Sequence, residues 1–107
     1  MAAAFYQTHT TTGAKTPWNG DWQLDHFTVT IAAIIVSGAA TYSVEYTLDD
    51  LNDTSVTPRW LTFDEAPVGT TATKVIQLNN PVLWVRINIA VITGTVEFKI
   101  IQGMRQR

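Results

Sequence analysis

Polar and apolar residues alternate along several stretches of the chain, with the period of two that is typical of β-strands. The clearest stretch is 42–48, where the apolar residues of one face are Tyr42, Val44, Tyr46 and Leu48. The residues between them are polar, namely Ser43, Glu45 and Thr47. Because successive side chains of a strand point to opposite faces of its sheet, this pattern predicts a half-buried antiparallel strand.

A longer strand is predicted from Phe27 onward. Val29, Ile31 and Ala33 alternate with polar or small residues up to an uninterrupted apolar run, 34–36, which ends at Ser37-Gly38. A loss of alternation within a strand is typical of a change of face or a β-bulge. We therefore expect such an irregularity near the end of this strand.

The C-terminal part of the chain contains two further alternating stretches, 85–91 and 96–100, on either side of Thr93-Gly94. In the first stretch, the apolar face consists of Val85, Ile87, Ile89 and Val91, and the opposite face carries Trp84, Arg86 and Asn88. Alternating segments around a short turn that contains glycine predict a β-hairpin. A shorter strand is expected at 74–78, before Pro81 interrupts the pattern.

Two intervening segments have the composition of loops. Residues 49–58 are rich in Asp, Asn, Thr and Ser, which cap turns through side-chain hydrogen bonds to the backbone. Residues 64–71 contain Pro67 and Gly69. Several short strands spaced by such loops predict an all-β fold, specifically a single small antiparallel β-sandwich that is jelly-roll-like.

Length and charge narrow the classes of function. A chain of 107 residues agrees with one domain, and its formal net charge of −2 provides no basic surface for nucleic acid or an anionic membrane. The longest apolar run is far shorter than the roughly 20 residues of a membrane-spanning helix, and residues 1–4 lack the basic start of a signal peptide. We expect a soluble protein that is made in the cytoplasm and binds neither nucleic acid nor a membrane. A core of this size also favours association into a homo-oligomer.

Residues 1–24 differ from the rest of the chain because they are rich in Thr and Ala and lack sustained alternation. This break predicts an extended N-terminal arm, 1–24, followed by a β-sandwich domain, 25–107. Large aromatic side chains often anchor interfaces, so Trp18 and Trp22 are candidates for docking on a neighbouring protein. In an alternative interpretation this segment folds across one sheet, with residues 5–9 as an edge strand.

The residue types that carry catalysis or bind metals do not form a recognisable set. His9 and His26 have no H-x-H or H-x-x-x-H spacing. The acidic segment 49–53 lacks the spacing of a calcium-binding loop, and we interpret it as a capped turn. The sequence has no cysteine, no G-x-S-x-G motif and no phosphate-binding glycine loop. It therefore predicts a protein that is not an enzyme and has neither a cofactor nor a metal site.

Trp60 and Trp84 allow different interpretations. Trp84 shares its strand face with Arg86, so we place it outside the densest part of the core. Trp60 follows Pro58-Arg59 and is interpreted as a plug between two sheets. Exposed aromatic side chains on a β-sandwich also form platforms for sugar rings, so a carbohydrate-binding module is the main alternative to a protein-binding one.

Four segments follow one another in a characteristic order. They are 40–50 (ATYSVEYTLDD), 58–60 (PRW), 81–82 (PV) together with 85–88 (VRIN), and 94–102 (GTVEFKIIQ). In this order the chain, over about residues 26–103, resembles the small structural proteins of tailed bacteriophages that act as capsid cement, or decoration, proteins.

This resemblance implies a compact β-sandwich that sits on the outside of an icosahedral head and clamps neighbouring major capsid subunits. The expected partners are the major capsid protein and further copies of the chain, as a dimer or a trimer, and the expected location is the outer surface of the virion. Our candidates for the interface are Phe5, Tyr6, Trp18, Trp22, Trp84 and Arg86. A tail or head-fibre component is the nearest alternative among virion proteins.

Overall fold

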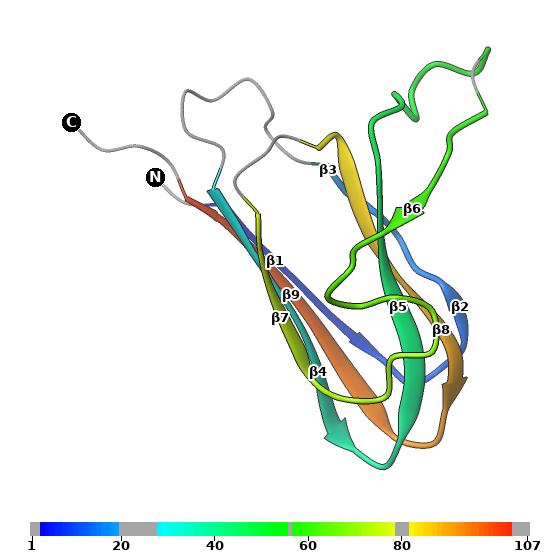
Figure 1. Cartoon of the computed structure of the whole chain (residues 1–107), viewed down its shortest axis with the longest axis vertical. Helices are drawn as coiled ribbons and strands as arrows, with labels where there is room; N and C mark the ends of the chain where they lie inside the picture. The colour runs from blue at the N-terminus through cyan, green and yellow to red at the C-terminus, as the bar shows by residue number, and fades with distance from the viewer. Residues whose placement is uncertain (1–2, 20–27, 56, 79–81, 104–107) are drawn as a thin grey trace.

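The computed structural model describes residues 3–19, 28–55, 57–78 and 82–103. The regular elements of these ranges are β-strands, which form two antiparallel sheets that face each other (Figure 1). Within the same ranges there is no helix long and apolar enough to span a membrane. The predicted all-β fold, a small antiparallel β-sandwich, is therefore confirmed.

The first sheet, sheet A, contains four strands in the order β1-β9-β4-β7. Their bounds are β1 Ala3–His9, β9 Thr95–Gly103, β4 Thr28–Ser37 and β7 Lys74–Leu78. The pairing of β4 with β9 shifts register between Ile35 and Ser37. This irregularity is the one that the apolar run 34–36 predicted.

The second sheet, sheet B, is built around two long strands, β5 and β8, which pair with each other. Short strands border this pair: β2 and β3 lie beside β8, and β6 lies beside β5. The bounds are β2 Gly13–Ala14, β3 Trp18–Asn19, β5 Ala40–Thr47, β6 Leu61–Thr62 and β8 Trp84–Ile92.

The core lies between the sheets and consists of every second side chain of the long strands. The fully buried apolar residues of these strands are Val29, Ile31, Ala33, Tyr42, Val44, Ile76, Val85, Ile87, Ile89, Val96, Phe98 and Ile100. Each fully buried side chain of this kind stabilises the fold by about 1.5–3 kcal/mol relative to exposure to water. The alternation that predicted the strands is thus the pattern that fills the core.

The prediction of a C-terminal hairpin around Thr93-Gly94 is wrong. The two strands do not pair with each other, because β8 belongs to sheet B and β9 to sheet A. The chain changes sheets at this corner, as it also does at residues 37–39 between β4 and β5. The two corners lie at the same end of the sandwich (Figure 1), and the Thr93 N–H donates to the Ala39 carbonyl oxygen at 2.9 Å. Alternation predicts that a segment is a strand, but not which sheet it joins.

Val91 was predicted on the core face of its strand, and this prediction is wrong as well. The pairing of β5 with β8 shifts register between Thr41 and Tyr42, so that Thr41 lies opposite Val91 and Tyr42 opposite Ile89. The shift reverses the alternation, and Val91 is 56% exposed on the outer face of sheet B.

The N-terminal segment forms strands in both sheets instead of a separate arm. Strand β1 pairs with β9 from Ala3, opposite Gln102, to His9, opposite Val96. Strands β2 and β3 pair with β8. Among the described residues before position 20, the alternative interpretation of an edge strand at 5–9 is therefore the correct one. Threonine and alanine in this segment concealed the strand because neither marks a core face.

Tyr42 fixes the loop that follows β6. Its backbone N–H and carbonyl bond with Thr70, and its hydroxyl donates a hydrogen bond to the Ala72 carbonyl oxygen. The ring is 1% exposed. Burial raises the pKa of Tyr42 to about 12, because the charged phenolate is disfavoured away from water.

This raised pKa predicts a loss of stability in alkaline solution. The unfolded chain releases the Tyr42 proton near pH 10, whereas the folded chain keeps it until about pH 12, so the free energy of unfolding falls as pH rises between these values. Between pH 9 and pH 11 we expect the wild type to lose roughly 1 kcal/mol more than Tyr42→Phe in urea denaturation. Tyr6→Phe, which changes an exposed tyrosine, is the control. Identical pH profiles for the wild type and Tyr42→Phe would contradict this account.

Candidate functional site

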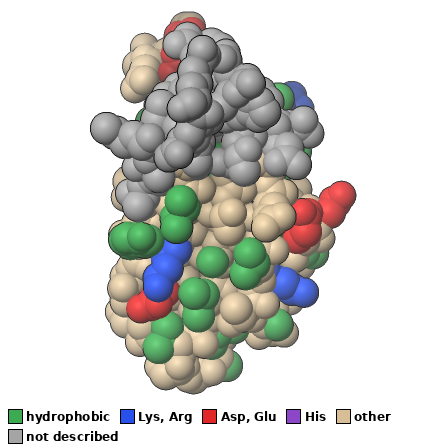
Figure 2. Space-filling view, turned by 90° about the vertical axis from the view of Figure 1, so that its left-hand side faces the viewer, with side chains coloured by type: hydrophobic (Ala, Val, Ile, Leu, Met, Phe, Trp, Pro, Cys, Tyr) green, Lys and Arg blue, Asp and Glu red, His purple; other side chains and the backbone are tan. Residues whose placement is uncertain are grey.

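The outer face of sheet A carries four of the eight large apolar side chains that are exposed among the described residues. We call it the Tyr6 face. Its apolar members are Tyr6, Ala32, Ile34, Val36, Val75 and Ile101. Four of them are large and exposed, at 63% for Tyr6, 58% for Val75, 54% for Val36 and 45% for Ile101. Figure 2 shows apolar side chains distributed over this face.

Neighbouring strands bring these side chains together. Ile101 lies opposite Thr30 on β4, and Val75 on β7 lies opposite Ala32. The inner positions of the same strands fill the core, so the residues between them must face outward. Several large apolar side chains exposed on one face of a sheet are a common sign of a site of interaction. The Tyr6 face is therefore our candidate functional site.

One ion pair lies within this apolar surface. Lys99 Nζ is 3.3 Å from Glu97 Oε1 and 5.9 Å from the centre of the Tyr6 ring. Both charged side chains are partly exposed, so the pair contributes little to the stability of the isolated domain. The pair gives the Tyr6 face one positive and one negative charge, so an apolar partner surface can cover it without leaving a net charge buried.

The outer face of sheet B carries a cluster of Trp60, Arg86 and Glu45. Arg86 Nε lies 2.7 Å from Glu45 Oε1, and the guanidinium carbon lies 3.9 Å from the centre of the Trp60 ring. These side chains are mostly buried, at 23% exposure for Arg86 and 12% for Glu45. Arg86 thus uses its charge and its flat face within the domain, where it holds Trp60 against the sheet.

The six predicted interface residues do not form one site. Tyr6 lies on the Tyr6 face, whereas Trp84 and Arg86 lie on the outer face of sheet B. Phe5 is partly buried and packs against the core. Trp22 lies outside the described residues.

Trp18 was predicted to be an exposed anchor for docking on a neighbouring protein, and this prediction is wrong. It lies opposite Val85 on β8 and is 7% exposed, so its side chain belongs to the core. Trp18 is therefore not available for docking on another protein. The physical reason is that β3 pairs with β8 and turns its first residue inward.

Trp60 was interpreted as a plug between the sheets, and this interpretation is wrong. Its ring lies under Arg86 on the outer face of sheet B, and it is only partly buried. The placement of Trp84 outside the core is confirmed, because Val85 and Ile87 on the same strand point inward and Trp84 does not.

The acidic segment 49–53 is a capped turn, as predicted. Asp50 Oδ1 accepts a hydrogen bond from the Asn52 N–H, and Asp49 Oδ2 accepts one from the Arg59 N–H at 2.7 Å. Asp53 accepts from both the hydroxyl and the N–H of Ser55, which lowers the pKa of Asp53. In the described ranges, no three His, Asp or Glu side chains are grouped as a metal site requires.

His9 makes a local contact within β1. Its Nε2 lies 2.9 Å from Gln7 Oε1. Partial burial lowers the pKa of His9, and the nearby Lys15 lowers it further. These surroundings favour the neutral imidazole at neutral pH. His26 lies outside the described residues.

Sequence reasoning missed most of the Tyr6 face, although a signal was present. Strands β4 and β9 carry apolar residues on both faces, as in the run 34–36 and in the pair Ile100-Ile101. A half-buried strand normally carries polar residues on its outer face. An apolar residue at an outward position was thus the available sign of a binding surface.

Comparison of the chain with protein-family models, curated proteins and solved structures finds no match.

Proposed function

We propose that this protein is a structural component of a tailed-bacteriophage head, which binds the outside of the shell and cements neighbouring major capsid subunits. The observation that carries the proposal is the Tyr6 face, an exposed apolar surface spread over all four strands of sheet A. The resemblance of the segments between 40 and 102 to capsid cement proteins supports the choice of partner. On this proposal the protein is made in the host cytoplasm and acts on the capsid surface.

Burial of the Tyr6 face provides the binding energy. Covering the exposed half of a valine or isoleucine side chain contributes on the order of 1 kcal/mol, so the four large members together supply several kcal/mol. Aromatic side chains dominate many interfaces, which makes Tyr6 the expected centre of the contact. Because the protein binds only the assembled shell, its binding energy adds to the free energy needed to open that shell.

Self-association is part of the proposal. Cement proteins of the resembling type occupy symmetry axes, and a dimer or trimer would present several Tyr6 faces to the shell at once. Sedimentation equilibrium of the purified protein measures the stoichiometry directly. A monomer at all concentrations would remove the homo-oligomer from the proposal without affecting the assignment of the Tyr6 face.

The alternative from another class is a carbohydrate-binding module. The observation that favours it is that Trp60 and Trp84 both lie on the outer face of sheet B. Arg86 already lies over the Trp60 ring, which leaves Trp84 as the aromatic side chain for sugar stacking. A glycan array hit that is lost on Trp84→Ala would favour this alternative, or a head-fibre or tail component with such a site.

The proposal predicts that a charge on the Tyr6 face weakens binding to the shell. Ile101→Glu places a carboxylate on this face, and we expect the affinity for purified capsids in a co-sedimentation assay to fall by about tenfold or more. Val91→Glu is the matched control, since it changes a β-branched residue of similar exposure on the other sheet. Equal loss for both variants, or no loss for Ile101→Glu, would contradict the assignment of the Tyr6 face.

A further inference from the structure

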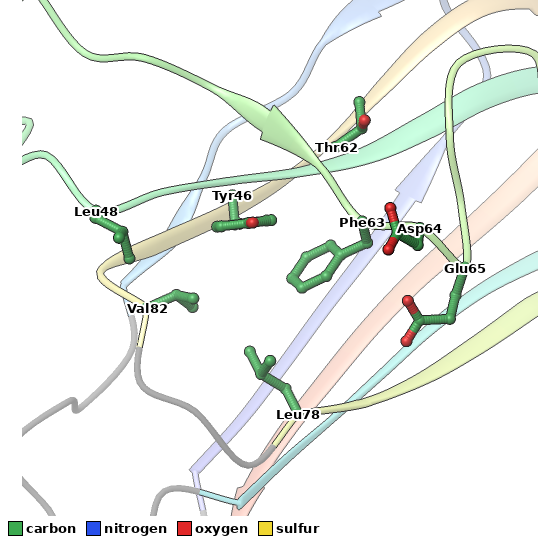
Figure 3. A pocket seen from close by; sticks show the side chains of 8 residues that line it. All are labelled: Tyr46, Leu48, Thr62, Phe63, Asp64, Glu65, Leu78 and Val82. Carbon is green, nitrogen blue, oxygen red and sulfur yellow. The ribbon is translucent and has the colours of Figure 1, made fainter.

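A crevice opens along the side of the sandwich, next to β7, which is an edge strand of sheet A. Its first hollow has a volume of about 320 Å³. The lining residues come from both sheets and are Tyr46, Leu48, Thr62, Phe63, Asp64, Glu65, Leu78 and Val82. Figure 3 shows Leu48, Val82 and Leu78 at one end and the carboxylates of Asp64 and Glu65 at the other. The crevice therefore has an apolar end and an acidic end.

A second hollow continues the crevice toward the start of β7. It has a volume of about 460 Å³ and is lined by residues 67–72 and Lys74 together with Asp64 and Glu65. Because both hollows share these two acidic residues, they form one path beside β7 from Leu78 to Lys74. We call this path the β7 crevice.

Strand β7 has a free edge. It is the last strand of sheet A and pairs only with β4 among the described strands. In an antiparallel ladder, every second residue of an edge strand directs its N–H and carbonyl group away from its neighbour. These groups are available to a further strand, and four of the five residues of β7 are not buried.

The opposite wall of the crevice is held in place. The Thr70 N–H donates to the Tyr42 carbonyl oxygen at 3.0 Å, the Val44 N–H donates to Ala66 at 3.0 Å, and Tyr42 also bonds to Ala72. A ligand therefore meets a preformed wall and does not have to order the loop on binding.

The charge of the crevice indicates the sign of its ligand. Asp64 and Glu65 are both exposed, and the ion pairs among the described residues are Arg86 with Glu45 and Lys99 with Glu97. Lys74 lines the second hollow, whereas the first hollow has no basic residue in its lining. The two carboxylates therefore leave the crevice with a net negative charge at the apolar hollow. This charge favours a cationic side chain next to an apolar one, and it disfavours nucleic acid and anionic membranes.

We propose that the β7 crevice binds an extended segment of a partner protein by strand addition to β7. An apolar side chain of the segment enters the end formed by Leu48 and Leu78, and a Lys or Arg side chain pairs with Asp64 or Glu65. Both side chains lie on the same face of the added strand, so they stand an even number of positions apart, and two positions is the shortest such spacing. This site is separate from the Tyr6 face and does not depend on a role in a capsid.

An NMR titration of the full chain tests this inference. The probe is the peptide acetyl-Thr-Leu-Thr-Arg-Thr-Leu-Thr-amide, in which a leucine stands two positions from the arginine in either direction. We expect the largest shifts at the backbone amides of residues 74–78 and 62–72. The peptide with Glu in place of Arg should bind at least about tenfold more weakly, because it brings a like charge to the acidic end.

Charge reversal supplies the decisive variant. Asp64→Lys combined with Glu65→Lys changes two exposed loop residues, so the fold should persist, and it should reverse the preference to the Glu peptide. Glu97→Lys, an acidic residue on the Tyr6 face, is the control and should keep the preference for Arg. No shift at residues 74–78, shifts confined to another surface, or equal binding of both peptides would overturn the inference.

Discussion

Removal of residues 1–9 is expected to abolish the cooperative fold of this protein or to lower its melting temperature by more than about 10 °C. The segment includes strand β1, which pairs with β9 from Ala3 to His9. Each ladder hydrogen bond contributes on the order of 1 kcal/mol, and the loss of β1 would also expose the fully buried Phe98 and Ile100 at a new edge. Since domains of this size are stable by roughly 5–15 kcal/mol, the truncation removes much of that margin.

Two adjacent substitutions separate packing from surface effects within β1. Phe5 packs against the core, so Phe5→Ala should cost about 2 kcal/mol or more in urea denaturation. Tyr6 is exposed, so Tyr6→Ala should change the free energy of unfolding by less than about 0.5 kcal/mol. A truncated protein with an unchanged melting temperature would instead support a separate arm, as the composition of residues 1–24 predicted.

Gly94→Ala is expected to be among the most destabilising single substitutions in the chain. A Cβ at this position would lie 2.0 Å from the carbonyl oxygen of Ser37 and 3.0 Å from the Cα of Gly38. Both atoms belong to the backbone of the other corner, so a side-chain rotation cannot relieve the clash. One of the two sheet-crossing corners must move, and we expect a loss of about 3 kcal/mol or more in thermal or urea unfolding.

Gly69→Ala is the matched control for this prediction. Gly69 has a φ of +93° but nothing within 4 Å of the added Cβ, so the substitution should cost only the backbone strain of about 1–2 kcal/mol. A smaller loss for Gly94→Ala than for Gly69→Ala would contradict the close contact between the two corners.

The sequence predicted the strands better than their partners. The alternation at Tyr42 to Tyr46 and at Val85 to Ile89 requires strands with one buried face, and these residues do fill the core. The assignment of β8 and β9 to different sheets depends on contacts between distant corners, such as the hydrogen bond from Thr93 to Ala39. No local pattern contains that information.

The candidate sites show a similar division. Tyr6 was selected from the sequence as an aromatic interface residue, and the structure leaves it exposed. Trp18 was selected on the same grounds, but the pairing of β3 with β8 buries it. Val75 carried no signal as a single residue, because the surface that it shares with Ile101 forms only when β7, β4 and β9 lie side by side.

The proposed role as a cement protein is tested most directly by the stability of the shell itself. On this proposal a bacteriophage encodes the chain, and capsids purified from it and stripped of the protein provide the assay. These capsids, incubated with wild type or with Ile101→Glu, would be heated until the genome becomes accessible to a DNA-binding dye. We predict that the wild-type protein raises the temperature of genome release and that Ile101→Glu fails to do so at the same concentration. An identical release temperature with and without the wild-type protein, under conditions where it saturates the particles, would contradict the cement function.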